Sequence, residues 1–143
     1  MNFTIAMTPV PKARARTVRG KDGGKSHSFT PTKTTTAEVN VRAAFQAAFP
    51  QHRAIEDVPL YLEVSVFILP PKSICTKKMM PLLEAEQVYV TKHPDLDNYE
   101  KLVMDALNGV AYRDDSLVAL KLGSKVYSFS PRLEITILPL RAL

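Results

Sequence analysis

The sequence predicts an α+β domain in which a small mixed β-sheet carries two main helices packed on it. Apolar and polar residues alternate from position 60 to 69, the pattern of a strand with one buried face. Two other segments, 35–49 and 97–107, repeat apolar residues at helical spacing. The expected order of strand, helix, strand, helix, strand, strand favours one compact layer structure. With 143 residues, 45% of them hydrophobic, the chain is expected to form a single domain over residues 1–143.

The first strand is expected over residues 2–7, and Pro9 and Pro11 end it because proline lacks a backbone N–H. Residues 12–34 are then predicted to form a mobile basic loop. Its first part, 12–25, holds six basic residues, one acidic residue and three glycines, without a hydrophobic period. A run of this kind is either a solvated loop or a surface for a polyanion, and both interpretations stay open here.

The first helix is expected to begin at Thr35 or Thr36. Thr35-Thr36-Ala37-Glu38 fits a capping box, in which a hydroxyl and a carboxylate each satisfy an unpaired backbone N–H. One apolar stripe follows, made of Val41, Ala44, Phe45 and Ala48. Pro50 ends the helix. The strand after it has a predicted buried face of Leu60, Leu62, Val64, Val66 and Ile68.

The second half of the chain is also predicted to contain both helices and strands. It contains a weak helix over 77–86, a short extended piece over 88–90, a helix over 97–107, and strands over 117–127 and 133–138. The helix over 97–107 has an apolar stripe of Leu102, Val103, Ala106 and Leu107. Asn108-Gly109 is a plausible stop for it, since glycine is favoured just after a helix.

Composition narrows the class of protein. Lys and Arg outnumber Asp and Glu by 19 to 14, which gives a net charge of +5 and favours partners rich in phosphate. The single cysteine, Cys75, leaves no internal disulfide and points to a reducing compartment. No apolar run approaches the ~20 residues of a membrane helix. We therefore expect a cytoplasmic protein with no membrane partner.

Acidic side chains gather in one stretch of this basic chain, around a lysine: Asp95, Asp97, Lys101, Asp105, Asp114 and Asp115. One interpretation is structural, because aspartate is favoured at and just after a helix start. Capping accounts for Asp95 and tolerably for Asp97. It does not account for Asp114 and Asp115, which are expected at the start of a strand, where aspartate is disfavoured.

The other interpretation is a magnesium site. Mg²⁺ takes oxygen ligands and keeps several waters, so one to three carboxylates suffice. Asp95 and Asp97 lie two residues apart, and Asp115 is expected on a neighbouring strand, so the three can converge on one ion. Such an ion polarises a phosphoryl oxygen and activates water. The lone cysteine and scattered histidines exclude zinc spacing, and Tyr99 and Glu100 stand where an EF-hand needs an acid and a glycine.

Lys101 has two interpretations as well. It lies four residues after Asp97 and four before Asp105, so on a helix the three share a face. They can form a surface ladder of ion pairs, each contributing about 0.3–0.5 kcal/mol. Alternatively, Lys101 faces the scissile phosphate and offsets its growing negative charge. Spacing alone does not choose between them.

The run from Pro94 to Gly109, Pro-Asp-Leu-Asp-Asn-x-x-Lys-x-x-x-Asp-Ala-Leu-Asn-Gly, followed by Asp-Asp-x-x-Val at 114–118, closely resembles the RusA family of Holliday junction resolvases. Residues 9–16 are similar to that family's opening Pro-x-Pro-Lys-x-Arg-x-Arg segment, and Phe-Thr-Pro at 29–31 and Lys125 are also typical. Pro94 is a departure, because some members carry a basic residue there. A DNA contact at that point would then come from Lys92 or from elsewhere.

The resemblance implies a RusA-like homodimeric endodeoxyribonuclease that resolves four-way DNA junctions by paired symmetric nicks, in DNA recombination and repair. It implies a Mg²⁺ cofactor, with Mn²⁺ as a substitute, and no small-molecule organic cofactor. Matched by position, the implied catalytic residues are Asp95, Asp97, Lys101 and Asp115. The three aspartates of that set are the implied metal ligands, and Asp114 is an additional candidate. A metal-activated water would attack the scissile phosphate.

A homodimer also suits the substrate, since a four-way junction is nearly two-fold symmetric and a closed isologous dimer presents two matching sites. The candidates for phosphate contacts are Lys12, Arg14, Arg16, Arg19, Lys92, Lys121 and Lys125. They predict steeply salt-dependent binding. Two alternatives remain: a non-catalytic basic module that binds nucleic acid, and a nuclease that acts on flaps or forks.

Overall fold

The computed structural model describes residues 1–20 and 23–141 and confirms an α+β fold with a mixed sheet. Four strands form the sheet in the order β1 (Asn2–Ala6), β6 (Arg132–Pro139), β4 (Leu60–Ile68), β5 (Val118–Tyr127). β4 and β5 are parallel, whereas β6 is antiparallel to both β1 and β4. The parallel pair is joined by a long crossover that contains the acidic stretch.

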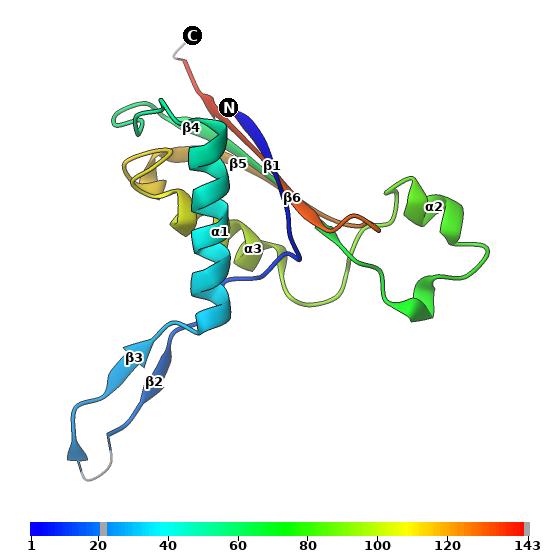
Figure 1. Cartoon of the computed structure of the whole chain (residues 1–143), viewed down its shortest axis with the longest axis horizontal. Helices are drawn as coiled ribbons and strands as arrows, with labels where there is room; N and C mark the ends of the chain where they lie inside the picture. The colour runs from blue at the N-terminus through cyan, green and yellow to red at the C-terminus, as the bar shows by residue number, and fades with distance from the viewer. Residues whose placement is uncertain (21–22, 142–143) are drawn as a thin grey trace.

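Two long helices, α1 (Thr32–Ala48) and α3 (Leu96–Leu107), pack against each other and against the sheet (Figure 1). The main core lies between them and the strands. The predicted alternation in β4 holds from Leu60 to Val66, but then Phe67 is buried and Ile68 only half-buried. Phe67 lies under the guanidinium of Arg132, whose Cζ is 3.6 Å from the ring centre, so this end of the strand is covered on its other face.

The segment predicted as a basic loop is structured in part. It contains a short antiparallel hairpin of β2 (Arg16–Val18) and β3 (His27–Phe29), and α1 begins at Thr32, before the predicted start. Residues 21 and 22 of the predicted loop lie outside the described residues. The hairpin extends away from the body of the molecule (Figure 1). The loop prediction was therefore wrong for β2, β3 and the first turn of α1.

The predicted capping box is also wrong. The N-cap position of α1 is Pro31, without a side-chain capping hydrogen bond. Glu38 instead forms an ion pair with Lys12, and the hydroxyl of buried Thr34 accepts a hydrogen bond from the backbone N–H of Ala13 at 3.3 Å. These groups join the start of α1 to the segment that leads into the hairpin.

The weak helix predicted over 77–86 is the shorter α2 (Met80–Glu84), preceded by the 3-10 turn η2 (Lys72–Ile74). This lobe projects from the opposite side of the molecule to the hairpin (Figure 1). It has a small core of its own, made of Leu83, Val90 and Tyr127. None of the helices in the described part of the chain has the length and apolar character needed to span a bilayer.

The region after α3 differs in one respect from the prediction. Gly109 adopts a left-handed φ of 75°, consistent with the predicted stop. Asp115 then opens the 3-10 turn η3 (Asp115–Leu117), and β5 begins only at Val118. Asp114 therefore precedes a helical turn and Asp115 is its first residue, so their expected place at the start of a strand was wrong.

Candidate active site

Asp95 and Asp97 lie at the start of α3. Asp95 occupies the N-cap position but makes no side-chain capping hydrogen bond, and Asp97 is an exposed residue of the first turn. Oδ1 of Asp95 is 2.7 Å from Nδ1 of His93, and both side chains are largely exposed. Capping therefore does not explain Asp95, and its carboxylate is accessible to a ligand from solvent.

Lys101 lies one turn further along α3 and joins two segments. Its Nζ is 2.9 Å from Oδ1 of Asp105 and 3.3 Å from Oδ2 of Asp115 in η3. The hydrogen bond to Asp105, together with that to Asp115, raises the pKa of Lys101 against the opposing effect of partial burial. The group thus stays an ammonium at neutral pH. The predicted ion pair between Lys101 and Asp105 is present. The same lysine also contacts Asp115, which comes from a separate element.

Asp114 has a local structural role. It is the N-cap of η3, and its Oδ1 accepts a hydrogen bond from the backbone N–H of Ser116 at 3.0 Å. That bond lowers the pKa of Asp114. Its neighbour Asp115 points its carboxylate to Lys101 instead. The two adjacent aspartates therefore differ: Asp114 caps η3, whereas Asp115 pairs with Lys101.

The acidic side chains near the start of α3 and in η3 offer the type of ligand atom that a hard cation prefers. Asp95, Asp97 and Asp115 offer carboxylate oxygens, the ligand type that Mg²⁺ prefers, and one or two of them suffice when water and phosphate oxygens complete the shell. Across residues 1–20 and 23–141, however, no group of three or more His, Cys, Asp and Glu side chains is arranged to hold a metal ion. The three-carboxylate set accordingly stays a prediction.

The sequence is similar to known proteins over most of its length. Residues 6–138 match the family described as Endodeoxyribonuclease RusA. The chain belongs to the RusA family. It is also 36% identical over 139 residues to Uncharacterized protein YqaN of Bacillus subtilis (strain 168), a match that covers 96% of this chain and 94% of that protein.

The family assignment makes the chain an endodeoxyribonuclease and confirms the resemblance predicted from its motifs. RusA-family nucleases act on junction DNA and generally depend on a divalent metal ion. The acidic motif residues of this RusA-family chain lie on α3 and η3 or directly before them.

Three of the basic residues predicted to contact DNA have partners inside the protein. Nζ of Lys121 is 2.7 Å from Oε2 of the buried Glu100. Lys12 forms ion pairs with Glu38 and Asp105. Nζ of Lys125 donates to the backbone carbonyls of Lys92 and Pro94, both at 2.8 Å. Lys125 thereby fixes the segment that enters α3. The other candidates, Arg14, Arg16, Arg19 and Lys92, are exposed.

The sequence indicated no role for Glu100 and the wrong role, in a capping box, for Glu38. Glu100 was considered only as a position that excludes an EF-hand, yet it is almost fully buried over β5. The one available signal was its place on the apolar side of α3, three residues before Val103. Glu38 gave a misleading signal, because it fits a capping motif that α1 does not use.

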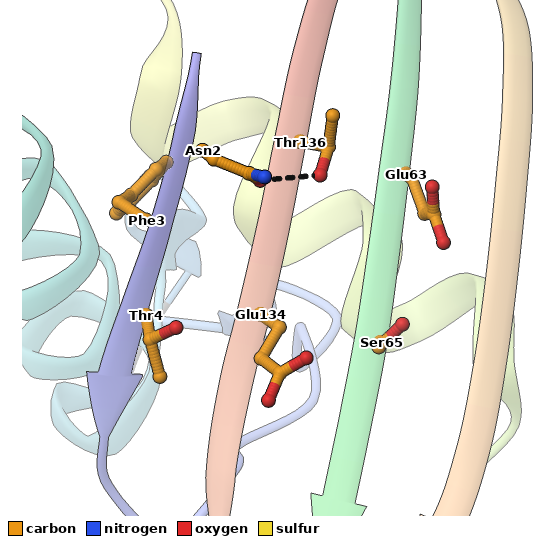
Figure 2. Close-up of a pocket in the computed structure, with 7 residues that line it drawn as sticks. All are labelled: Asn2, Phe3, Thr4, Glu63, Ser65, Glu134 and Thr136. Carbon is orange, nitrogen blue, oxygen red and sulfur yellow. Dashed lines mark hydrogen bonds between the residues drawn. The ribbon is translucent and has the colours of Figure 1, made fainter.

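A polar pocket lies away from this site, on the sheet face opposite the helices (Figure 2). It is lined by Asn2, Phe3, Thr4, Glu63, Ser65, Glu134 and Thr136. The hydroxyl of Thr136 donates to the side-chain oxygen of Asn2 at 2.6 Å. None of the motif aspartates lines this pocket, so we do not assign the nuclease site to it.

Proposed function

We propose that this protein is a Mg²⁺-dependent, structure-specific endodeoxyribonuclease that resolves Holliday junctions by paired symmetric nicks. The observation that carries the proposal is the 3.3 Å contact between Lys101 and Asp115. It brings together two parts of the RusA motif from separate elements, beside an N-cap aspartate that does no capping. Family membership supports the junction substrate.

In the proposed mechanism Asp95, Asp97 and Asp115 would hold the metal ion. When bound, the ion would supply a Lewis acid for a phosphoryl oxygen and lower the pKa of a water molecule. Lys101 is the catalytic residue that presents positive charge to the scissile phosphate, where it stabilises the negative charge of the transition state. Its pairs with Asp105 and Asp115 keep the ammonium charged and oriented.

Paired nicks require two sites, which we propose are supplied by a homodimer. A closed two-fold dimer places identical sites at symmetric positions of a four-way junction. The exposed arginines of the hairpin segment, Arg14, Arg16 and Arg19, then contact phosphates of the junction arms. We propose no small-molecule organic cofactor and a cytoplasmic location, consistent with the single cysteine.

The test is a time course of junction cleavage with mapped nick positions. A fixed four-way junction is labelled on each strand in turn and incubated with the protein, with Mg²⁺ and without it. A three-way junction and a linear duplex built from the same arms serve as controls. We expect symmetric nicks on two opposed strands of the four-way junction, only when Mg²⁺ is present.

Two results would replace this proposal. Preferential nicking of the three-way substrate would assign the protein to flaps or forks. Absence of strand scission with either Mg²⁺ or Mn²⁺, combined with intact binding, would assign it to non-catalytic nucleic-acid binding.

A further inference from the structure

Five side chains of alternating charge form a continuous chain from α1 to η3. In order, they are Glu38, Lys12, Asp105, Lys101 and Asp115. Nζ of Lys12 is 2.8 Å from Oδ2 of Asp105, while Oδ1 of the same carboxylate is 2.9 Å from Lys101. Asp105 thus uses one oxygen for each lysine. All four contacts between neighbouring side chains of this series are within hydrogen-bond distance. The series ends at Asp115, a carboxylate of the proposed site.

The inner links are shielded from solvent. Side chains of Lys12 and Asp105 are 24% and 22% exposed, whereas Lys101 is 54% exposed. Charges interact more strongly where water is partly excluded. Burial acts to raise the pKa of Asp105, but hydrogen bonds from Lys12 and Lys101 outweigh it and lower that pKa. Asp105 is therefore charged at neutral pH and balanced by two ammonium groups.

Lys12 is also fixed through its backbone. Its N–H donates to the carbonyl of Asn98 at 2.8 Å, in the first turn of α3 beside Asp97. The next residue, Ala13, bonds Thr34 of α1. Lys12 is therefore held between both long helices, four residues before the β2–β3 hairpin begins at Arg16. A lysine in this setting does not have its ammonium available for a phosphate.

We propose that Lys12 and Asp105 are positioning residues that hold Lys101 in its catalytic orientation, and that Lys12 does not contact DNA. This inference rests on the proposed function. Without Lys12, one oxygen of Asp105 loses its cation, and the carboxylate draws the Lys101 ammonium toward itself and away from Asp115. The same ion chain links the base of the hairpin to the catalytic lysine.

The experiment separates catalysis from binding in the full-length protein. Lys12→Gln, Lys12→Arg and Asp105→Asn are compared by their single-turnover rate constants at saturating four-way junction with Mg²⁺. Dissociation constants are measured without divalent ions over a range of salt concentrations. Arg14→Gln, which removes one charge from the same segment, is the matched comparison for binding. Arg53→Gln, exposed in the loop between α1 and β4, is the neutral control.

We expect Lys12→Gln to lower the single-turnover rate about 10- to 100-fold, as misplaced supporting groups do, with its dissociation constant within about twofold of wild type. Lys12→Arg keeps both ion pairs and restores most of the rate. We expect Asp105→Asn likewise to lower the single-turnover rate and to leave the dissociation constant nearly unchanged. This variant replaces Lys12→Gln in the test if circular dichroism shows that Lys12→Gln does not fold. Arg14→Gln raises the dissociation constant, and Arg53→Gln changes neither quantity.

A change in the dissociation constant without a change in the single-turnover rate would overturn the inference. If Lys12→Gln weakens binding, lowers the salt dependence by about one phosphate contact and keeps the saturated rate, Lys12 is a DNA contact as first predicted. An unchanged rate and affinity also refute a positioning role. Failure of the proposed function is distinguishable, since wild-type protein would then not nick the junction at all.

Discussion

At the scale of single residues, aspartates that precede helical segments have two different roles here. Asp114 satisfies the backbone N–H of Ser116, whereas Asp95 leaves the start of α3 without a side-chain cap and contacts His93. An uncapped helix start forgoes about 1 kcal/mol of stability. The Asp95 carboxylate does not cap α3, which is consistent with a functional role for this carboxylate.

Glu86 gives a prediction about pH at the same scale. Arg132 donates to both of its oxygens, at 2.7 and 3.0 Å, and the hydroxyl of Ser128 donates at 2.6 Å. These bonds lower the pKa of Glu86 below its ordinary value of 4.5. A lowered pKa in the folded state means stability that is present above pH 4.5 and lost as pH falls through the folded-state value.

Urea unfolding at pH 7 and pH 3 measures this contribution. We expect wild-type protein to lose more stability between these pH values than Glu86→Gln does, by about 1 kcal/mol after allowing for solvent screening. Equal losses in the two proteins would show that Glu86 does not contribute to the pH dependence.

At the scale of elements, α3 lies very close to β5 at Gly123. A Cβ atom there would be 2.2 Å from Oε1 of Glu100 and 3.1 Å from Cδ2 of Leu96. Glu100 is buried and held by Lys121, so it does not move aside freely. Glycine at position 123 therefore lets the helix that carries Asp97 and Lys101 sit directly on the edge strand.

We predict that Gly123→Ala destabilises the protein by about 1–3 kcal/mol, as overpacking does. Chemical denaturation gives the free energy of unfolding. In the Glu100→Ala background, the same substitution is expected to cost less, because its main obstacle is gone. An equal cost in both backgrounds would argue against the contact as the cause.

The elements predicted correctly from sequence are those whose signal lies within one segment. β4 and α3 each have a periodic apolar face that follows directly from local spacing. β2 and β3 were missed because their described residues are all exposed and carry no such period. The false cap of α1 has a long-range cause, since Glu38 finds a partner 26 residues away in Lys12.

The same reasoning applies to the site. The spacing of Lys101 and Asp105 predicted that they share a face of α3, and the structure pairs them at 2.9 Å. The grouping of Asp95, Asp97 and Asp115 around one ion stays a prediction. The internal partners of Lys12, Lys121 and Lys125 were not predictable, because each lies at least 21 residues away in sequence or belongs to the backbone. A basic residue counted from composition says nothing of whether its charge is already paired.

At the scale of the whole molecule, the hairpin and the α2 lobe project on either side of the segment that enters α3 (Figure 1). Each chain carries the acidic RusA motif once. Two cuts on a symmetric junction therefore require two subunits, and we predict a particle of twice 15.9 kDa. Light scattering coupled to size exclusion measures this mass. A mass of one chain, at concentrations where junctions are symmetrically nicked, would contradict the dimer.

The central claim is that Asp95, Asp97 and Asp115 carry metal-dependent cleavage, and Asp97→Asn tests it most directly. Cleavage of a four-way junction with Mg²⁺ and binding without Mg²⁺ are measured for wild type, for this variant and for Asp57→Asn, a control with a side chain that is 83% exposed and pairs with Arg113. We predict that Asp97→Asn loses more than about 100-fold in cleavage rate and binds as tightly as wild type or tighter, since a negative charge facing phosphate is removed. Wild-type cleavage by Asp97→Asn would contradict the account.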